Sequence, residues 1–269
     1  MFNKLSGKTR LYPIIGDPIK HVESPERLTR SFSECGHNGI CIPMQVQEGY
    51  LESVMQLFTS ISNIDGLLVT MPHKFNAYKY CATSSERSKL LKTVSVVRRN
   101  PDGSWHGDML DGLAFVKAQK DQGAHPEGAR VLLVGAGGTG RAIAIALIKT
   151  GVRELIIYDK NEDRVKELIE LVEDLDHCRV IFGPPDPTGC DMVFNATPMG
   201  MEKGDPLPVD EELLAPSMFV GDVISGRGET PLLSAAKVAG CKTANGNQMV
   251  EAVQEMMIDF MLSDISDGA

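Results

Sequence analysis

Short apolar runs alternate along the chain with segments in which apolar residues recur every three or four positions. In the first part, this pattern predicts strands over 11–15, 40–46 and 66–70, and helices over 25–35 and 50–58. Ser24 stands where an N-cap oxygen is expected. A helix between two strands brings the chain back to the end of the sheet where the first strand began, so we expect mostly parallel pairing.

A hairpin and a second set of alternating elements follow. The apolar runs 94–99 and 105–107 flank the turn sequence 100–103 and predict an antiparallel hairpin at the edge of the first sheet. The later pattern predicts strands over 131–134, 155–158, 180–182, 192–194 and 219–223, and helices over 111–122, 141–149, 162–175, 231–239 and about 248–262. The stretch 123–128 contains one Pro and two Gly and is predicted to be a linker.

Length and composition agree with a folded α/β protein. The chain has 269 residues, of which 42% are hydrophobic and 23% are charged. These values exclude a disordered or collagen-like chain. At roughly 150 residues per domain, the length fits one large or two modest domains. The net charge of −9 repels phosphate backbones, so we expect no nucleic-acid partner.

The cysteines and the first residues indicate the compartment. None of the six cysteines forms a C-x-x-C pair or stands at zinc-finger spacing from a histidine, so we expect reduced thiols and no metal. The first ten residues lack the apolar core of a signal peptide. The apolar stretch 142–148 is too short to span a bilayer. We expect a cytoplasmic protein without a membrane partner.

A glycine-rich loop carries the clearest functional signal. Gly135, Gly137 and Gly140 satisfy the pattern G-x-G-x-x-G between a predicted strand and a predicted helix. The first glycine permits a tight turn, the second lets a pyrophosphate approach the backbone, and the third lets helix and strand pack closely. The helix N-terminus then offers N–H groups to the phosphates. We therefore expect a dinucleotide cofactor.

Asp159 indicates which dinucleotide this is. It ends the next strand, 24 positions beyond Gly135. A carboxylate there accepts hydrogen bonds from a ribose 2′-hydroxyl and repels a 2′-phosphate, which favours NAD over NADP. Lys160 and Arg164 lie close in sequence and soften that repulsion, so NADP remains an alternative. Asp159 can also be read as a solvated strand-end residue or a helix cap.

Lys74 and Asp111 are the candidate acid–base groups. Hydride transfer to or from an alcohol needs a group that exchanges the hydroxyl proton. Lys74 follows a strand end, where ligands collect in parallel sheets, and Asp111 begins a predicted helix. From the residues alone, a solvated lysine and a helix cap explain them equally well.

Motifs along nearly the whole chain resemble the shikimate dehydrogenase family. They are Gly16-Asp17-Pro18-Ile19-Lys20-His21 with Ser24-Pro25, Val69-Thr70-Met71-Pro72-His73-Lys74, Asp111-Gly112, the loop from Gly135 to Ala142, Asn195-Ala196-Thr197-Pro198-Met199-Gly200, Thr230-Pro231-Leu232-Leu233, and Gly246 with Met249. The resemblance implies an α/β protein of two domains, with an N-terminal substrate domain and a C-terminal Rossmann-type dinucleotide-binding domain.

The resemblance also implies residue roles and boundaries. Lys74 and Asp111 would be the acid–base pair. Cofactor contacts would come from Gly135, Ala136, Gly137, Gly138, Thr139, Gly140, Arg141, Asp159, Lys160, Arg164, Asn195, Thr197, Met199, Val223, Gly246 and Met249. The substrate positions would be Val22, Ser24, Thr70, Ser95, Ser225 and Val253. We expect the substrate domain over 1–112, the dinucleotide-binding domain over 113–246, and a helix over about 247–269 that packs back on the first domain.

Several of these positions depart from the family pattern. The first serine of the opening motif is Val22, and the asparagine of a V-N-T segment is Ser95. The asparagine–threonine pair before the aspartate is Met109-Leu110, and the tyrosine after the fifth strand is Ser225. The glutamine of the last helix is Val253, with Gln254 one position away, and the cofactor triplet asparagine–arginine–threonine is Asp159-Lys160-Asn161. Polar substrate contacts are lost while the acid–base pair is kept.

We therefore expect a nicotinamide-dependent oxidoreductase that acts on a cyclic hydroxy acid or a related alcohol or ketone. Its activity on shikimate should be weak or altered, and NAD should be preferred. A genuine shikimate or quinate dehydrogenase is the first alternative. A non-catalytic nucleotide-binding regulator is the second, and retention of Lys74 and Asp111 argues against it. The partners expected are a small-molecule substrate and, if the chain is not a monomer, a second copy in a homodimer.

Overall fold

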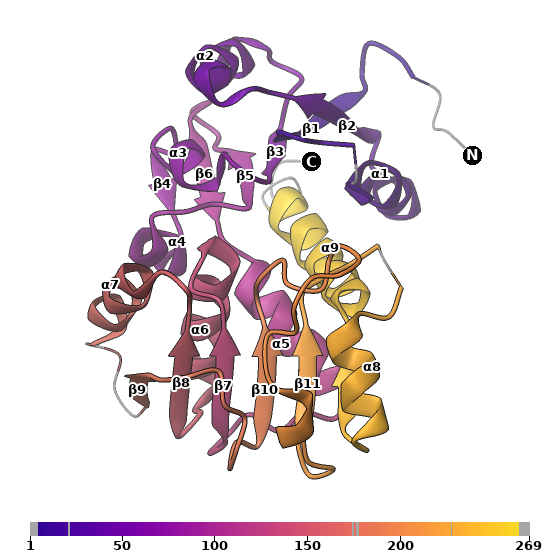
Figure 1. Cartoon of the computed structure of the whole chain (residues 1–269). Coiled ribbons are helices and arrows are strands. Elements are labelled where there is room, and N and C mark those ends of the chain that lie inside the picture. Colours follow the sequence, from indigo (N-terminus) through magenta and orange to yellow (C-terminus); the bar gives the residue numbers. More distant parts are fainter. Residues whose placement is uncertain (1–4, 21, 174, 176–177, 227, 264–269) are drawn as a thin grey trace. The chain divides into compact units, whose positions relative to one another are not determined.

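The computed structural model describes residues 5–20, 22–173, 175, 178–226 and 228–263 (Figure 1). It divides into two compact units. Unit 1 comprises Met1–Leu110 and Gln254–Ala269, and unit 2 comprises Asp111–Val253. The long helix α9, Gly246–Leu262, begins in unit 2 and ends in unit 1.

Unit 1 is built on a mixed sheet of six strands in the order β2-β1-β3-β5-β6-β4. The strands are β1 Arg10–Gly16, β2 Gly39–Gln45, β3 Gly66–Val69, β4 Thr83–Ser84, β5 Val96–Arg99 and β6 Trp105–Asp108. The helices are α1 Ser24–Glu34, α2 Leu51–Ser60, α3 Lys74–Tyr78 and α4 Glu86–Leu91. Strands β1, β2 and β3 pair in parallel, while β5 is antiparallel to both β3 and β6.

Burial explains why these strands form. All four residues of β3 are buried, as expected for a strand covered on both faces. The core beside it gathers Ile15, Met55, Leu67, Val97 and Trp105, each at most 3% exposed. At the outer strand β2, Pro43 removes a backbone donor, which fits an edge position.

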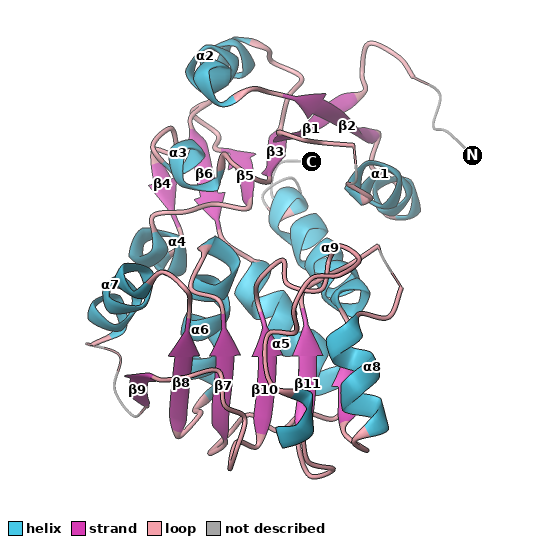
Figure 2. Ribbon diagram, in the orientation of Figure 1, coloured by secondary structure: helices cyan, strands magenta, loops and turns pink. Residues whose placement is uncertain are grey.

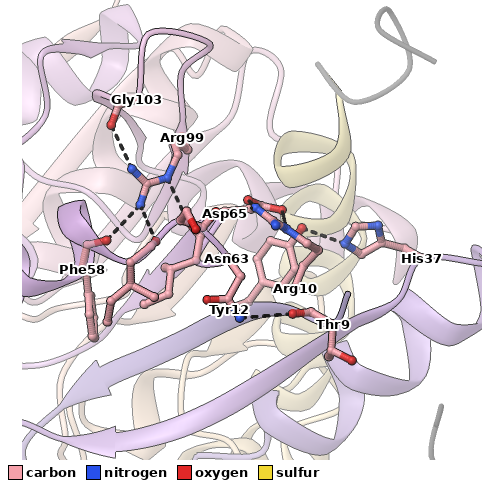
Figure 3. A network of polar contacts seen from close by, with 12 residues as sticks. Thr9, Arg10, Tyr12, His37, Phe58, Asn63, Asp65, Arg99 and Gly103 are labelled. Carbon is pink, nitrogen blue, oxygen red and sulfur yellow. Dashed lines mark hydrogen bonds and ion pairs between the residues drawn. The ribbon is translucent and has the colours of Figure 1, made fainter. Parts of the chain in front are cut away.

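A half-buried polar network around Arg99 holds the end of β5 (Figure 3). The Arg99 guanidinium lies 4.3 Å from the centroid of the Trp105 ring. It donates hydrogen bonds to the backbone oxygens of Phe58, Thr59, Ile61, Ile64 and Gly103. Two of these oxygens belong to the last turn of α2, where carbonyls have no partner within the helix. One side chain therefore caps α2 and ties it to the β5–β6 turn.

Unit 2 is a fully parallel sheet in the order β12-β11-β10-β7-β8-β9. Figure 2 shows β8, β7, β10 and β11 side by side with their arrowheads pointing the same way. The strands are β7 Arg130–Val134, β8 Glu154–Tyr158, β9 Arg179–Phe182, β10 Met192–Asn195, β11 Phe219–Asp222 and β12 Lys242–Ala244. The helices are α5 Asp111–Asp121, α6 Gly138–Thr150, α7 Glu162–Val172, α8 Pro231–Val238 and the first part of α9. The strand order reverses between β7 and β10, which places a topological switch point there.

The predicted fold class is confirmed, since both units are α/β and unit 2 has the doubly wound parallel sheet. Some local predictions are wrong. Helix α1 begins at Ser24 itself, with Glu23 at the cap position and no capping side chain. The β5–β6 hairpin is not at the sheet edge, because β4 pairs with β6 outside it. The stretch 123–128 joins α5 to β7 within unit 2 and is no linker between units.

Two α-helices and two strands are absent from the predictions: α3, α4, β4 and β12. The two helices have five and six residues, less than two helical turns, so they show no amphipathic period; the two strands have two and three residues. Helix α6 begins three residues before the predicted start, because the glycines of 138–140 belong to its first turn. In the part of the chain that the structure describes, no helix is both long and apolar enough to cross a membrane.

Candidate active site

Lys74 is the first residue of α3 and is half-buried. The segment before it follows β3, and the Thr70 N–H donates to the oxygen of Ile15 at 2.9 Å. The Lys74 carbonyl accepts the N–H of Val94 at 3.1 Å. The backbone of Lys74 is thus fixed between the end of the parallel strands and the start of the hairpin.

The side chain of His73 adds a third hydrogen bond that fixes the same segment. Its side chain is fully buried, and Nε2 lies 2.6 Å from the carbonyl oxygen of Val46. Because a carbonyl oxygen only accepts, Nε2 carries the proton and donates it. The motif Val69-Thr70-Met71-Pro72-His73-Lys74 contains His73, and its hydrogen bond to Val46 gives it a structural role in this segment.

The opening motif packs against the lysine segment. The N–H of Asp17 donates to the oxygen of Met71 at 2.9 Å. At Gly16 an added Cβ would lie 2.3 Å from Cγ2 of Thr70, so only glycine fits there. His21, which belongs to this motif, lies outside the described residues.

The substrate positions of unit 1 have different surroundings. Val22, Ser24 and Thr70 are half-buried. Val22 lines a hollow of about 810 Å³ whose wall also includes Lys20 and Arg27. Ser95 is 1% exposed, and its Oγ accepts the N–H of Leu110 at 3.0 Å. That hydroxyl oxygen therefore serves the backbone of the segment that leads to Asp111.

A buried ion pair fixes the start of that segment. Asp108 is 4% exposed and accepts hydrogen bonds from the guanidinium of Arg87 and the hydroxyl of Ser85. The same carboxylate accepts the N–H of Met109 at 2.7 Å. A buried carboxylate with this many donors stays in one place. The last residues of unit 1 are therefore held rigidly against the β5–β6 hairpin.

Asp111 opens unit 2 as the first residue of α5 and is 6% exposed. The next residue, Gly112, packs directly against α6, since an added Cβ would lie 2.0 Å from the oxygen of Ala142. Ala142 belongs to the beginning of α6, directly after the glycine loop. The carboxylate and the loop are thus brought to the same end of the parallel sheet, where ligands of such sheets bind.

The glycine loop has the geometry of a phosphate cradle. At Gly135, with φ +112°, and at Gly140, an added Cβ would come within 2.8 and 2.0 Å of backbone oxygens. At Gly137, by contrast, a Cβ would meet open space. Gly137 is the N-cap of α6 and has no side chain to accept the first N–H groups of the helix. These donors and the free space before them suit a pyrophosphate.

Asp159 lies beside this cradle. It is 8% exposed, and its two carboxylate oxygens accept the N–H of Ala136 at 2.8 Å and of Asn161 at 2.9 Å. Each oxygen keeps a second acceptor position. Lys160 and Arg164 are exposed nearby. Arg141 lies against the glycine loop, since its Nε donates to the oxygen of Ala136 at 3.2 Å, and its guanidinium also pairs with Glu167.

The loops after β10 and β11 contain the other predicted cofactor positions. The loop after β10 packs on the glycine loop, because a Cβ at Gly135 would also meet Cγ2 of Thr197 at 2.9 Å. Gly246 faces the loop after β11, with an added Cβ 2.4 Å from the oxygen of Val223. Hydroxyl Oγ1 of Thr197 accepts the N–H of Met199 at 3.0 Å.

The remaining predicted positions lie on the second of these loops and on α9. Ser225 is exposed in the loop after β11, whereas Met249 and Val253 are half-buried one helical turn apart on α9. Gln254 is engaged within unit 1, where Nε2 donates to Oγ of Ser31 at 2.6 Å and to the oxygen of Arg27. No group of three or more His, Cys, Asp or Glu side chains suited to a metal ion occurs among the described residues.

A parallel sheet with a switch point and a glycine cradle defines a dinucleotide-binding α/β protein. Two models of known families match the chain in order. The shikimate dehydrogenase substrate binding domain matches residues 14–97, within unit 1. The model described as shikimate / quinate 5-dehydrogenase matches residues 117–181, within unit 2.

Individual relatives cover nearly the whole chain. The shikimate dehydrogenase (NADP(+)) of Rubrobacter xylanophilus is 33% identical over 252 residues, which is 92% of this chain and 88% of that protein. The structure of Listeria monocytogenes shikimate 5-dehydrogenase with shikimate and NAD has a TM-score of 0.89 at 27% identity, covering 98% and 95% of the two chains. Quinate dehydrogenase from Corynebacterium glutamicum with NAD has a TM-score of 0.86 at 25% identity, covering 95% and 94%.

The chain belongs to the shikimate dehydrogenase family. It is an NAD(P)-dependent oxidoreductase of the shikimate/quinate dehydrogenase type that binds a small-molecule substrate and a nucleotide cofactor. The predicted family and enzyme class are confirmed.

Replacement of Gly135 by alanine should abolish tight cofactor binding. The new Cβ would lie 2.8 Å from the oxygen of Ala196 at a positive φ, so the loop must move. We expect the dissociation constant for NAD(P)H to rise about a hundredfold or more, in calorimetric titrations.

Gly151→Ala is the matched control. Gly151 also has a positive φ, +90°, but an added Cβ there meets open space. This variant should lose about 1 kcal/mol of stability and bind the cofactor as wild type does. Equal loss of affinity in both variants would show that backbone strain, and not crowding of the cradle, controls binding.

Proposed function

We propose that the protein transfers a hydride between a nicotinamide cofactor and a cyclic hydroxy acid or a related alcohol or ketone other than shikimate. One observation carries this proposal. The segment bearing Lys74 is held in place by hydrogen bonds at Thr70, His73 and Lys74, while the apolar Val22 stands where the family pattern has a serine. The held lysine supports proton transfer, and Val22 offers no hydroxyl to a substrate.

The first alternative, a genuine shikimate or quinate dehydrogenase, is favoured by the relatives of those names. A buried hydrogen bond to a charged group contributes about 1.5–3 kcal/mol. Loss of two or three such contacts would lower kcat/KM on shikimate by orders of magnitude, because about 1.4 kcal/mol corresponds to a factor of ten. The two readings therefore predict very different rates.

In the mechanism proposed here, the bound nicotinamide supplies or accepts the hydride. Lys74 donates a proton to the forming alkoxide in the reductive direction and accepts it in the oxidative direction. Asp111 orients the ammonium and stabilises its charge. Ser24 and Thr70 offer hydroxyls to the substrate, while Ser95 acts through the backbone of Leu110. Substrate binding is assigned to residues 1–112 and cofactor binding to 113–246.

The cofactor preference proposed is NAD over NADP. The carboxylate of Asp159 is fixed by two backbone N–H groups beside the cradle, and its charge disfavours a 2′-phosphate. Lys160 and Arg164 are exposed and can reduce this repulsion without removing it. The Rubrobacter xylanophilus relative is named for NADP(+), so the proposed preference would distinguish this chain from that protein.

Lys74→Ala should stop catalysis without preventing cofactor binding. Loss of a general acid typically lowers kcat by about a hundredfold to ten-thousandfold. The NAD(P)H dissociation constant should stay unchanged, because no cradle residue is altered. Lys79→Ala is the control, since Lys79 is exposed at the end of the same helix, where it bonds only Asn76 among the contacts described. Undiminished turnover in Lys74→Ala would contradict the assignment.

Wild-type protein should show weak activity on shikimate in a screen of cyclic hydroxy acids and related alcohols with quinate as a second reference. Val22→Ser should raise kcat/KM on shikimate about tenfold or more, because it restores one hydroxyl to the hollow. Val54→Ser, on α2 away from this hollow, is the control. Wild-type rates on shikimate as high as those of ordinary family members would establish the alternative function.

Asp159→Asn should shift the cofactor preference toward NADP. The substitution removes the negative charge but keeps an oxygen that can accept one backbone N–H. We expect the ratio of KM for NAD to KM for NADP to rise about tenfold or more. Asp163→Asn removes an exposed charge from the following helix start and should leave the ratio unchanged. A wild-type protein with a lower KM for NADP would contradict the proposed preference.

A further inference from the structure

A buried carboxylate outside the predicted site lies at the centre of the loops on one side of the switch point. Asp222 is the last residue of β11 and is fully buried. Oδ1 accepts the N–H of Ile224 at 3.0 Å, and Oδ2 accepts the hydroxyl of Thr230 at 2.8 Å. Burial raises the pKa of Asp222, while these hydrogen bonds act in the opposite direction. The carboxylate thus holds the loop after β11 and the N-cap of α8 together.

The same carboxylate also reaches the loop after β10. Nδ2 of Asn195 donates to Oδ1 of Asp222 and to the oxygen of Met199, both at 3.2 Å. Oδ1 of Asn195 accepts the N–H of Thr197 at 3.0 Å and its hydroxyl at 2.7 Å. Asn195 is itself fully buried. The shape of residues 196–199 therefore depends on Asp222 through one side chain.

Two glycine contacts connect this network to the rest of the cofactor site. The loop after β10 packs on the glycine loop through Ala196 and Gly135. The loop after β11 packs on the start of α9 through Val223 and Gly246, where an added Cβ would lie 2.4 Å away. Asp222 is therefore the common anchor for both loops beyond the cradle.

The position of these loops indicates which half of the cofactor they serve. In a doubly wound sheet the pyrophosphate lies at the first helix, and the adenosine ribose lies beside the acidic residue after the second strand. Here these are the start of α6 and Asp159, next to β7 and β8. Strands β10 and β11 lie on the opposite side of β7. Their loops therefore face the other half of a dinucleotide.

We propose that Asp222 is a positioning residue for the nicotinamide half of the cofactor, acting through Asn195 and Thr230 without touching the cofactor itself. This inference rests on the proposed dinucleotide site. The proposal predicts different behaviour for two ligands that share the adenosine and pyrophosphate groups. Binding of a whole nicotinamide dinucleotide needs the anchored loops, whereas binding of ADP-ribose needs only the cradle and the region of Asp159.

Calorimetric titration of Thr230→Val with NADH and with ADP-ribose tests the proposal. If wild type binds NADPH more tightly, NADPH and 2′-phospho-ADP-ribose replace them. Valine has nearly the shape of threonine but cannot donate to Asp222. We expect the dissociation constant for NADH to rise about tenfold and that for ADP-ribose to change less than about twofold. Thr230→Ser keeps the hydroxyl and should bind both ligands as wild type does.

Asp222→Asn gives a second measurement should Thr230→Val fail to fold, and the same selective loss is expected. Thr150→Val is the matched control, because it removes a hydroxyl that bonds a backbone oxygen within α6. Equal weakening of NADH and ADP-ribose, or failure of Thr230→Ser to restore NADH binding, would overturn the positioning role. A wild-type protein that binds neither dinucleotide would instead overturn the dinucleotide site itself.

Discussion

Close backbone contact at glycine positions is the constraint on which the cofactor side of unit 2 depends. Gly140 lies so near the carbonyl of Gly135 that a Cβ would stand 2.0 Å from it, and Gly112 lies equally near Ala142. Interiors are packed as densely as organic crystals, so a methyl group cannot be accommodated there by small shifts. A third contact, between Gly135 and the oxygen of Ala196, brings the loops after β7 and β10 together at the same end of the sheet.

Buried polar side chains then hold the loops that glycine allows to approach. Asp222, Asp159 and His73 each accept or donate hydrogen bonds to backbone groups of neighbouring segments. A buried carboxylate without such partners would be strongly destabilising, whereas a satisfied one fixes its partners in one arrangement. In the function proposed here, Asp159 has two roles: it fixes the shape of the glycine loop and it faces the ribose. Asp222 and His73 only fix the backbone of neighbouring segments.

The alternating fold could be predicted because long segments carry a clear hydrophobic period. The parallel sheet of unit 2 follows from its buried strands, and the glycine loop follows from its spacing. Short helices such as α3 and α4 could not be predicted, since five or six residues make less than two helical turns. The N-cap at Ser24 failed because Pro25 fits the first turn and lets the helix begin one residue earlier.

Side-chain partners were also beyond prediction. The hydroxyl of Ser95 bonds the N–H of Leu110, fifteen residues away, and Gln254 bonds Ser31 on α1. Both contacts depend on how elements pack, which the local sequence does not encode. Motif spacing located Asn195 and Thr197, but it could not show that Asp222 anchors them. A residue that only positions other residues belongs to no sequence motif from which its role could be predicted.

In the proposed function, the residues that transfer the proton and the residues that recognise the substrate are held in place by different contacts. The backbone of Lys74 is held by hydrogen bonds that involve Ile15, Val46 and Val94, and none of these depends on the side chain at position 22. A change from a polar to an apolar residue at Val22 can therefore alter which substrate fits without displacing the lysine. The same separation holds in unit 2, where Asp222 fixes loop shape and Asp159 meets the ribose in the proposed site. In the function proposed here, single residues can therefore change the substrate or the cofactor while the reaction stays the same.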